Sequence, residues 1–294
     1  MDNAILTLNG IKTAFALKAS KIDPLTKAIY KDLTSDKPFE NYLFDEHAFQ
    51  IKERGSNKTG FQEFAKKYNY AVHNKTWDAR IWMDKIAFED ADSIVPGYIK
   101  GKVDEAALSF KRHPDKLLND ILAANPATFD GSNLFANSHN IGSAATIDNN
   151  LAITGTTEAN IRTDLEYAYD ALISFQWADG EPINPPGMGK FYVLVPAQLE
   201  RTFTAIRNNP QTSTGVANPW YNIFDIILNS YQLTSDNTWY MTYVTPGREP
   251  LMFQLRKAVK WNYKDDPEDT DYKWLAEARY AAAPAWFTSI IRIA

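Results

Sequence analysis

The chain has 294 residues, of which 45% are hydrophobic and 13% aromatic, which is enough for one large or two ordinary folded domains and excludes a disordered chain. A balance of 31 Lys and Arg against 36 Asp and Glu gives a net charge of -5, which argues against a protein that mainly coats nucleic acid. The absence of cysteine excludes disulfides, thiolate metal sites and a cysteine nucleophile. No window has the ~18 apolar residues of a membrane span and no export signal opens the chain, so we expect a soluble protein without membrane contact.

The first forty residues carry few apolar side chains, with lysines such as Lys12, Lys18 and Lys21 between them. Scattered lysines usually mark a solvated surface, so this composition favours an arm of helix and coil over a dedicated nucleic-acid arm. Such an arm is also compatible with lying on another subunit.

The next segment, from Phe44 to Thr76, is polar and has a turn composition, rich in Gly, Ser and Asn, between Gly55 and Gly60. The stretches on either side predict the two strands of a long hairpin, which projects from the body because its faces are too polar for a core. No Gly-Lys-Ser/Thr sequence ends the segment, so it is not a phosphate-binding loop.

Residues 77–83 alternate apolar and polar side chains, which predicts a half-buried strand. After Pro96-Gly97, apolar residues at helical spacing predict one helix that ends at His113-Pro114 and a second helix that begins there. Asn125-Pro126 is expected to stop the second helix.

Further along, Thr157 followed by Glu158 predicts the start of another helix. A fully apolar strand is predicted at 191–195, and Pro196 is predicted to open a helix. Strands dominate the last third and are predicted at 222–228, 239–244, 251–259 and 272–281. A single strand-helix unit does not support a parallel nucleotide-binding sheet, so we expect an α+β fold whose last strands return to the early helices.

One polar stretch, Phe129 to His139, contains Asp130, Ser138 and His139, the residue types of a catalytic triad. Adjacent Ser and His side chains cannot easily reach one another, and no Gly-x-Ser-x-Gly elbow is present. We therefore interpret the stretch as a structural turn. Its turn would be made by Asp130-Gly131 and held by apolar anchors, namely Phe129, Leu134 and Phe135. On this interpretation, substitution of Ser138 or His139 impairs folding or assembly far less than Phe135→Ala does.

No catalytic, cofactor-binding or metal-ligating residue is predicted. The four histidines are widely separated, and the acidic run from Asp265 to Asp271 lacks the Gly and Glu of an EF-hand loop. Paired carboxylates cannot be recognised from sequence alone, and the eight tryptophans keep a carbohydrate-active enzyme as an alternative of another class.

Several motifs follow one another in a fixed order: Asn74-Lys75-Thr76-Trp77, Phe88-Glu89-Asp90, His113-Pro114-Asp115, Phe129-Asp130-Gly131-Ser132-Asn133-Leu134-Phe135, Val193-Leu194-Val195-Pro196, Trp239-Tyr240 and Pro250-Leu251-Met252-Phe253-Gln254-Leu255-Arg256. This ordered set resembles the Mu-type phage major head subunit family, which are major capsid proteins with the Hong Kong 97 fold. The resemblance covers about residues 40 to 290.

The resemblance implies a domain organisation. Residues 1–43 would be an N-terminal arm and 44–76 an extended loop that reaches over a neighbouring subunit. Residues 77–125 together with 251–294 would form a peripheral domain around a spine helix, and 126–250 an axial domain. Candidate contacts between subunits then lie at the loop tip: Gly55, Asn57, Lys58, Gly60 and Phe61.

The implied function is mechanical. Copies of the chain would form hexamers and pentamers that close into an icosahedral shell around double-stranded DNA, contacted without specificity. Separate scaffold, portal and decoration proteins would be partners, no cofactor is needed, and assembly in the host cytoplasm would place the chain in the virion capsid. An encapsulin-like compartment or gene-transfer particle of the same fold is the alternative.

Overall fold

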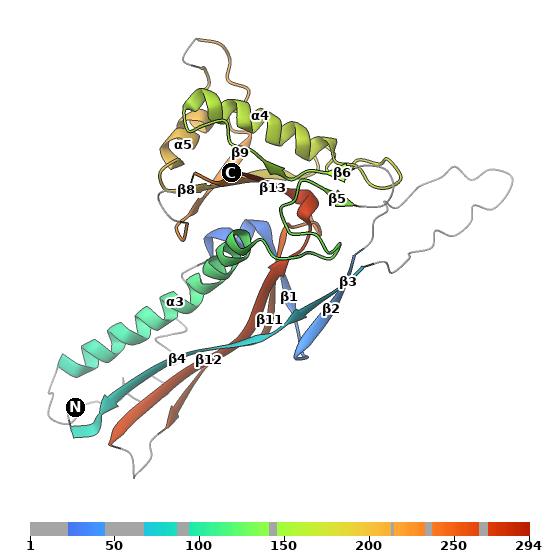
Figure 1. Cartoon of the computed structure of the whole chain (residues 1–294). Coiled ribbons are helices and arrows are strands. Elements are labelled where there is room, and N and C mark those ends of the chain that lie inside the picture. Colours follow the sequence, from blue (N-terminus) through green and yellow to red (C-terminus); the bar gives the residue numbers. More distant parts are fainter. Residues whose placement is uncertain are drawn as a thin grey trace, which may run out of the picture.

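The computed structural model describes residues 23–44, 68–86, 94–140, 146–212, 215–232, 237–264 and 270–294. Within these residues the chain builds a long four-stranded sheet beside a long helix, and a five-stranded sheet covered by two shorter helices (Figure 1). The long sheet and its helix extend away from the five-stranded sheet. The predicted mixed α+β class is confirmed.

The four-stranded sheet has the order β1-β11-β12-β4. Its strands are β1 (Tyr30–Thr34), β4 (Lys75–Asp84), β11 (Leu251–Lys264) and β12 (Asp271–Pro284). β1 runs parallel to β11, and the other neighbours are antiparallel. The predicted alternation is confirmed in β4, because Trp77 and Ala79 are half-buried while Asp78 and Arg80 are exposed. The long strands therefore present one apolar face along their length.

That face packs against helix α3 (Ile94–Ala124). Val103 and Ala107 of the helix contact a cluster that includes Trp261 of β11 and Trp274 of β12. The prediction of two helices meeting at His113-Pro114 is wrong, because α3 continues through Pro114. A proline removes one helical hydrogen bond and strains the preceding turn, but here the buried apolar face continues on both sides of it and outweighs that cost.

The five-stranded sheet has the order β7-β13-β10-β8-β9. Its strands are β7 (Asn150–Leu151), β8 (Lys190–Pro196), β9 (Phe224–Asn229), β10 (Trp239–Val244) and β13 (Ile290–Ile293). Helices α4 (Glu158–Ser174) and α5 (Glu200–Asn208) pack on it. The predicted cap is confirmed, since Thr157 Oγ1 accepts a hydrogen bond from the Asn160 amide. Pro196 does not open a helix: it ends β8, and α5 begins at Glu200 after a turn.

The start of the described chain differs from a solvated arm. The 3-10 helix η2 (Leu25–Ile29) buries Ile29 completely, and β1 follows it as an edge strand of the long sheet. Two further strands, β2 (Phe39–Phe44) and β3 (Tyr68–His73), pair antiparallel, so the two ends of the predicted hairpin lie side by side. Its tip, between Gly55 and Gly60, lies outside the described residues.

The end of the chain joins the other sheet. After the 3-10 helix η3 (Phe287–Ser289), β13 pairs with β10, with Trp239 opposite Ile293. Residues 290–293 were expected beside 251–284 in one domain, but they lie in the sheet built mainly from residues 150–244. The three isoleucines of β13 require burial on both faces, and the position between β7 and β10 in this sheet buries all three completely.

Candidate functional site

The two sheets meet at the stretch that follows α3, and this junction contains the predicted turn residues. The turn itself is held by Asp130, whose Oδ1 accepts hydrogen bonds from the Thr128 hydroxyl (2.6 Å) and the Ser132 amide (3.0 Å). Gly131 follows with φ of 85°, the left-handed region that favours glycine. The carboxylate thus replaces backbone partners that the reversing chain lacks.

Phe129 lies at the centre of an aromatic cluster, which we call the junction cluster: Phe44, Tyr68, Phe129, Trp286 and Phe287. The ring of Phe129 stacks on Phe44 with centroids 4.2 Å apart and lies 5.1 Å from Phe287. Phe44 ends β2 and Tyr68 begins β3. The base of the predicted hairpin is therefore packed into the contact between the two sheets.

Leu134 and Phe135 anchor the other side of the turn. Both are buried, and the ring of Phe135 packs against Tyr240 of β10 and under the Arg292 guanidinium. Asn125, which follows the last residue of α3 and has a left-handed φ of 48°, binds both backbone groups of Phe135. Its side-chain Nδ2 donates to the Phe135 carbonyl and its Oδ1 accepts from the Phe135 amide. The helix end and the turn are thereby fixed to each other.

Asp130 also binds His139, nine residues later in the chain. The His139 Nδ1 and the Asp130 Oδ2 are 2.8 Å apart, and the side chains are 0% and 2% exposed. The imidazole stacks on Phe287 with centroids 3.8 Å apart. His139 thus does not lie at the surface of the turn, because its ring joins the turn to η3 inside the core.

The electrostatics of this pair follow from its surroundings. Burial by itself raises the pKa of Asp130, but hydrogen bonds from His139 and Thr128, the charge of His139 and the Ser132 amide together hold that pKa below its usual value. The carboxylate is therefore the stable form in the fold.

The pair does not form a catalytic triad with Ser138. The Ser138 side chain is exposed, whereas the His139 Nε2 is buried and has no hydrogen-bond partner among the described residues. A nucleophile and its base must be within hydrogen-bond reach. The residues of the predicted triad thus serve structure: two are joined in the core, and the third faces outward.

Two buried asparagines, which were not predicted, complete the junction. Asn149 donates from Nδ2 to the carbonyls of Leu134 and Phe287, and its Oδ1 accepts from the Ala136 amide. Asn184 donates to the carbonyls of Leu172 and Thr288. Each side chain satisfies backbone groups from segments far apart in sequence, so no local pattern marks them.

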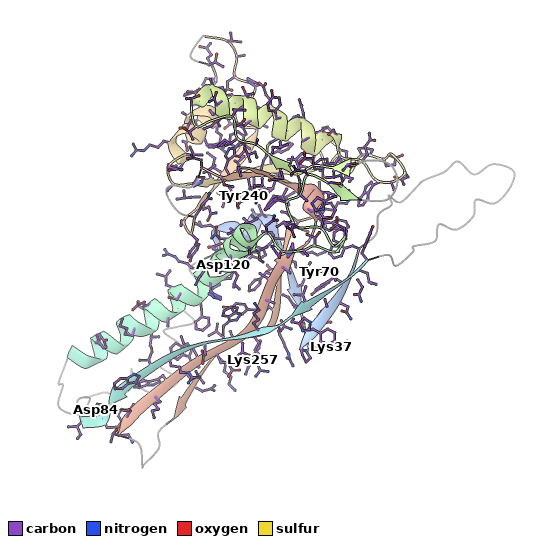
Figure 2. All side chains as sticks on the ribbon, in the orientation of Figure 1. Lys37, Tyr70, Asp84, Asp120, Tyr240 and Lys257 are labelled. Carbon is purple, nitrogen blue, oxygen red and sulfur yellow. The ribbon has the colours of Figure 1, made fainter. Side chains whose placement is uncertain are left out.

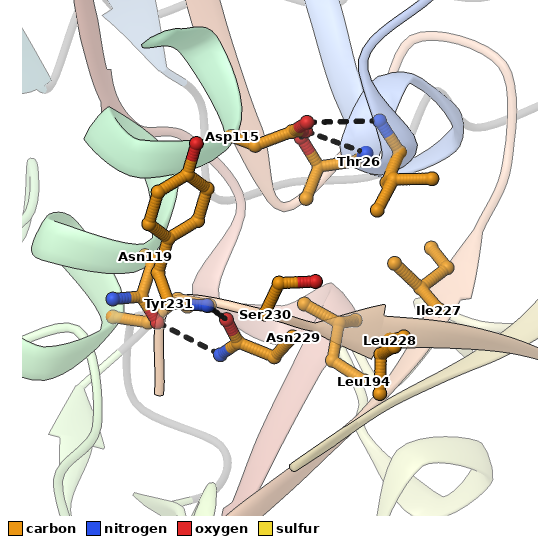
Figure 3. A pocket seen from close by; sticks show the side chains of 11 residues that line it. Thr26, Asp115, Asn119, Leu194, Ile227, Leu228, Asn229, Ser230 and Tyr231 are labelled. Atoms are coloured by element: carbon orange, nitrogen blue, oxygen red, sulfur yellow. Dashed lines mark hydrogen bonds between the residues drawn. The ribbon is translucent and has the colours of Figure 1, made fainter. Parts of the chain in front are cut away.

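A second contact, also not predicted, fixes the start of the described chain to α3 (Figure 3). The Asp115 carboxylate accepts hydrogen bonds from the Leu25 amide, the Thr26 amide and the Thr26 hydroxyl. Beside it, Asn229 of β9 donates to Asn119 of α3. A small pocket at this point lies between η2, α3 and β9.

The hairpin base is attached to both neighbours. The Tyr70 hydroxyl donates to the Ala127 carbonyl at the junction, and the Tyr42 hydroxyl donates to Gln254 of β11. Figure 2 shows Tyr70 between the two sheets, with Asp84 at the far end of the long sheet. The candidate contacts at the tip, which are Gly55, Asn57, Lys58, Gly60 and Phe61, lie outside the described residues.

Within the part of the chain that the structure describes, no group of three His, Asp or Glu side chains is placed to hold a metal ion. No helix among the same residues is long and apolar enough to cross a membrane. Most of the acidic run, from Asp265 to Asp269, lies outside the described residues.

Several solved structures are similar to this fold. The fold matches the virus-like particle from Pyrococcus furiosus with a TM-score of 0.57 at 11% identity, over 98% of this chain and 99% of that one. It matches the procapsid of bacteriophage JBD30 (TM-score 0.50, 14% identity, 99% of this chain and 75% of that one). The capsid of an empty GTA particle also matches (TM-score 0.51, 11% identity, 95% and 96%). At these identities the likeness shows the fold, which is the expected Hong Kong 97-like fold.

A comparison with curated proteins found no significant match. The family described as phage capsid protein matches residues 75–292, which is most of the chain and includes α3, the turn at Asp130 and the strands of the two larger sheets apart from β1. This match identifies a structural protein rather than an enzyme, so the carbohydrate-active alternative is not retained. The chain therefore belongs to the phage capsid protein family.

Proposed function

We propose that this chain is the major capsid protein of a tailed, Mu-like phage or prophage, and that its copies assemble as hexamers and pentamers into an icosahedral shell around double-stranded DNA. The observation that carries the proposal is the family match over residues 75–292. In such a shell the subunit performs no chemistry, and its task is to present the same contacts many times.

The exposed apolar side chains support a role in assembly. Trp82 on β4 and Ile86 just beyond it are each 68% exposed, at the end of the long sheet farthest from the junction (Figure 1). Contacts with neighbouring copies would remove this surface from water. Modest contacts of this kind add up when each subunit makes several at once.

For the domains, we propose the organisation that the resemblance implies, with two changes. Residues 25–34 are assigned to the peripheral domain instead of the arm, because β1 pairs with β11. Residues 290–293 are assigned to the axial domain, because β13 pairs with β10. The extended loop, residues 44–76, leaves the body at the junction cluster, whose packing would set the direction in which it reaches a neighbour.

The proposed partners are further copies of the chain, a separate scaffold protein, a portal and decoration proteins. Contact with packaged DNA would be local and non-specific, because a net charge of -5 gives little general attraction to phosphate. The proposed location is the virion capsid, after assembly in the host cytoplasm.

A second candidate is the shell of an encapsulin-like compartment or gene-transfer particle. It is favoured by the nearly complete reciprocal coverage with the Pyrococcus furiosus particle and the GTA capsid. The two candidates differ in content, so nuclease-protected DNA from purified particles separates them: long genomic DNA supports the phage, and short mixed fragments or protein cargo support the alternative.

Electron microscopy of the purified chain tests the proposal most directly. Closed shells, or rings with six-fold and five-fold symmetry, are expected under assembly conditions. A monodisperse monomer under all such conditions would contradict the proposal.

The loop assignment has its own test. Deletion of Gly55–Gly60 should leave a folded subunit that no longer forms closed shells, whereas replacement of the same six residues by a Gly-Ser linker of equal length should retain part of the assembly. Normal shells from the deletion would show that this tip does not bridge subunits.

A further inference from the structure

The loop between α5 and β9 carries no charged residue. Residues 208–224 contain no Asp, Glu, Lys, Arg or His, although 23% of the chain is charged. The structure describes 208–212 and 215–224 of this loop, which projects beyond α4 at the end of the molecule opposite the long sheet (Figure 1). Val216, Tyr221 and Ile223 in it are 63%, 45% and 43% exposed. The loop therefore presents several apolar side chains to solvent, which is typical of an interaction surface.

The buried side chain of Asn218 fixes this loop to the helices beside it. Its Nδ2 donates to the carbonyls of Ile206 (2.6 Å) and Asn209 (2.7 Å) at the end of α5. Its Oδ1 accepts from the Arg162 guanidinium of α4 at 2.7 Å. Trp220, two residues further on, is also buried. A surface that is already fixed loses little conformational entropy when a partner covers it.

Charged residues next to the loop are engaged in ion pairs. Asp225, which follows the loop, binds both Arg207 and Lys190. Glu158 binds Arg162 at 2.8 Å. The loop is therefore bordered by paired charges, and its own surface is neutral.

We propose that this loop meets the same loop of other copies of the chain around a rotation axis of the assembly. Near such an axis each residue lies close to the same residue of the other copies, so a charged surface would repel itself. A surface of tyrosine and apolar side chains without charge avoids that repulsion and has the composition of an interface core. The inference rests on the proposed function, because it names a surface through which shell subunits meet.

Opposite charges placed at one position of the loop test this contact in the full-length chain. Tyr221→Asp and Tyr221→Lys each give every copy the same charge, so each alone should raise the protein concentration needed for assembly roughly ten-fold or more. In an equimolar mixture of the two variants opposite charges meet, and the threshold should return to within about three times that of the parent. Light scattering during assembly measures these thresholds.

Tyr167 on α4 supplies the matched control, because it is 58% exposed and lies outside the loop. Tyr167→Asp and Tyr167→Lys should change the threshold less than about two-fold. Urea unfolding shows whether each variant is folded. If substitution of Tyr221 prevents folding, the same two changes are made at Ile223, which is also exposed.

A second measurement does not require closed shells. The chain has no cysteine, so Tyr221→Cys and Tyr167→Cys each carry a single thiol for a short bismaleimide cross-linker. Two chains should be joined roughly ten times faster through Tyr221→Cys than through Tyr167→Cys. A parent that forms no shells while its Tyr221→Cys variant cross-links preferentially would contradict the proposed function and support this inference.

Two kinds of result would overturn the inference even if the parent forms shells. Assembly of both Tyr221 charge variants at the parent's threshold, or equal cross-linking rates for the two cysteine variants, would show that copies do not meet at this loop. Loss of assembly that the equimolar mixture fails to restore would show that the loop meets a different surface or another partner.

Discussion

At the scale of single residues, the least expected feature is the buried pair of Asp130 and His139. We predict that His139→Ala destabilises the subunit by about 3 kcal/mol, because it leaves a buried carboxylate without its main partner and removes the ring that stacks on Phe287. The adjacent Ser138→Ala is the matched control and should change stability by less than ~0.5 kcal/mol. Urea denaturation of the unassembled subunit measures both, and equal small effects would show that the pair carries no stability.

The same pair predicts an acid dependence. The pKa of Asp130 in the fold lies below its usual value of 3.8, so its contribution to stability is complete above that value and is lost as the pH falls through the lowered pKa. Asp130→Asn removes this contribution. Its free energy of unfolding should therefore be lower than that of the parent at pH 6, and the difference should shrink as the pH falls below about 4. A difference that is constant with pH would contradict the assignment.

The contribution of apolar packing to the stability of the turn can be tested at Phe135. Phe135→Ala should lower the free energy of unfolding by about 3 kcal/mol, because it leaves a cavity where the buried ring packs against Tyr240. Phe39→Ala, at a phenylalanine that is 44% exposed, should cost much less. Thermal and urea unfolding measure the stability of both variants. An equally small loss of stability at both positions would mean that the turn collapses into the space left by the missing ring.

At the scale of elements, the Asp115 carboxylate ties η2 to α3. Asp115→Ala should cost on the order of 3 kcal/mol, since three hydrogen bonds to Leu25 and Thr26 are lost together. Asp120→Ala, at an exposed position on the same helix, is the control. Hydrogen exchange should increase in residues 25–34 and remain unchanged in β8 and β10. An increase spread over the whole chain would show global unfolding instead of release of one element.

The helices and strands also show which structural features local sequence patterns can predict. Alternation in β4, the cap at Thr157 and the apolar strand β8 are local signals, and each predicts its element correctly. The predictions at Pro114 and Pro196 fail because tertiary packing decides whether a helix continues through a proline or begins at it. A short stretch of sequence carries no information about that packing.

The residues of the junction also fall into those that local sequence patterns predict and those that they do not. The apolar character of Leu134 and Phe135 predicts their burial, and Asp130-Gly131 predicts the turn. The contact of His139 with Phe287 and the bonds of Asn149 cannot be predicted, because their partners come from the other end of the chain. A polar residue in a loop sequence looks the same whether it faces water or satisfies a buried carbonyl.

At the scale of the whole molecule, the junction cluster joins three segments that lie far apart in the sequence. Phe44 belongs to the hairpin base, Phe129 to the turn after α3 and Phe287 to the segment between the two sheets. Aromatic packing therefore fixes the hairpin base, the turn and the segment between the sheets to one another.

The last prediction concerns the far end of the long sheet, and it tests assembly rather than folding. Trp82 is 68% exposed, so Trp82→Ser should change the free energy of unfolding of the free subunit by less than ~0.5 kcal/mol. If neighbouring copies cover this side chain, the same change removes a large aromatic contact from every interface of that type. Because repeated contacts add, shell formation should then require a protein concentration at least ten times higher. Thr76→Ser, near the other end of β4, serves as the control, and light scattering during assembly gives the threshold concentration for both variants. An unchanged threshold for Trp82→Ser would place the contact between subunits elsewhere on the molecule, while loss of stability in the free subunit would show that the ring serves the fold.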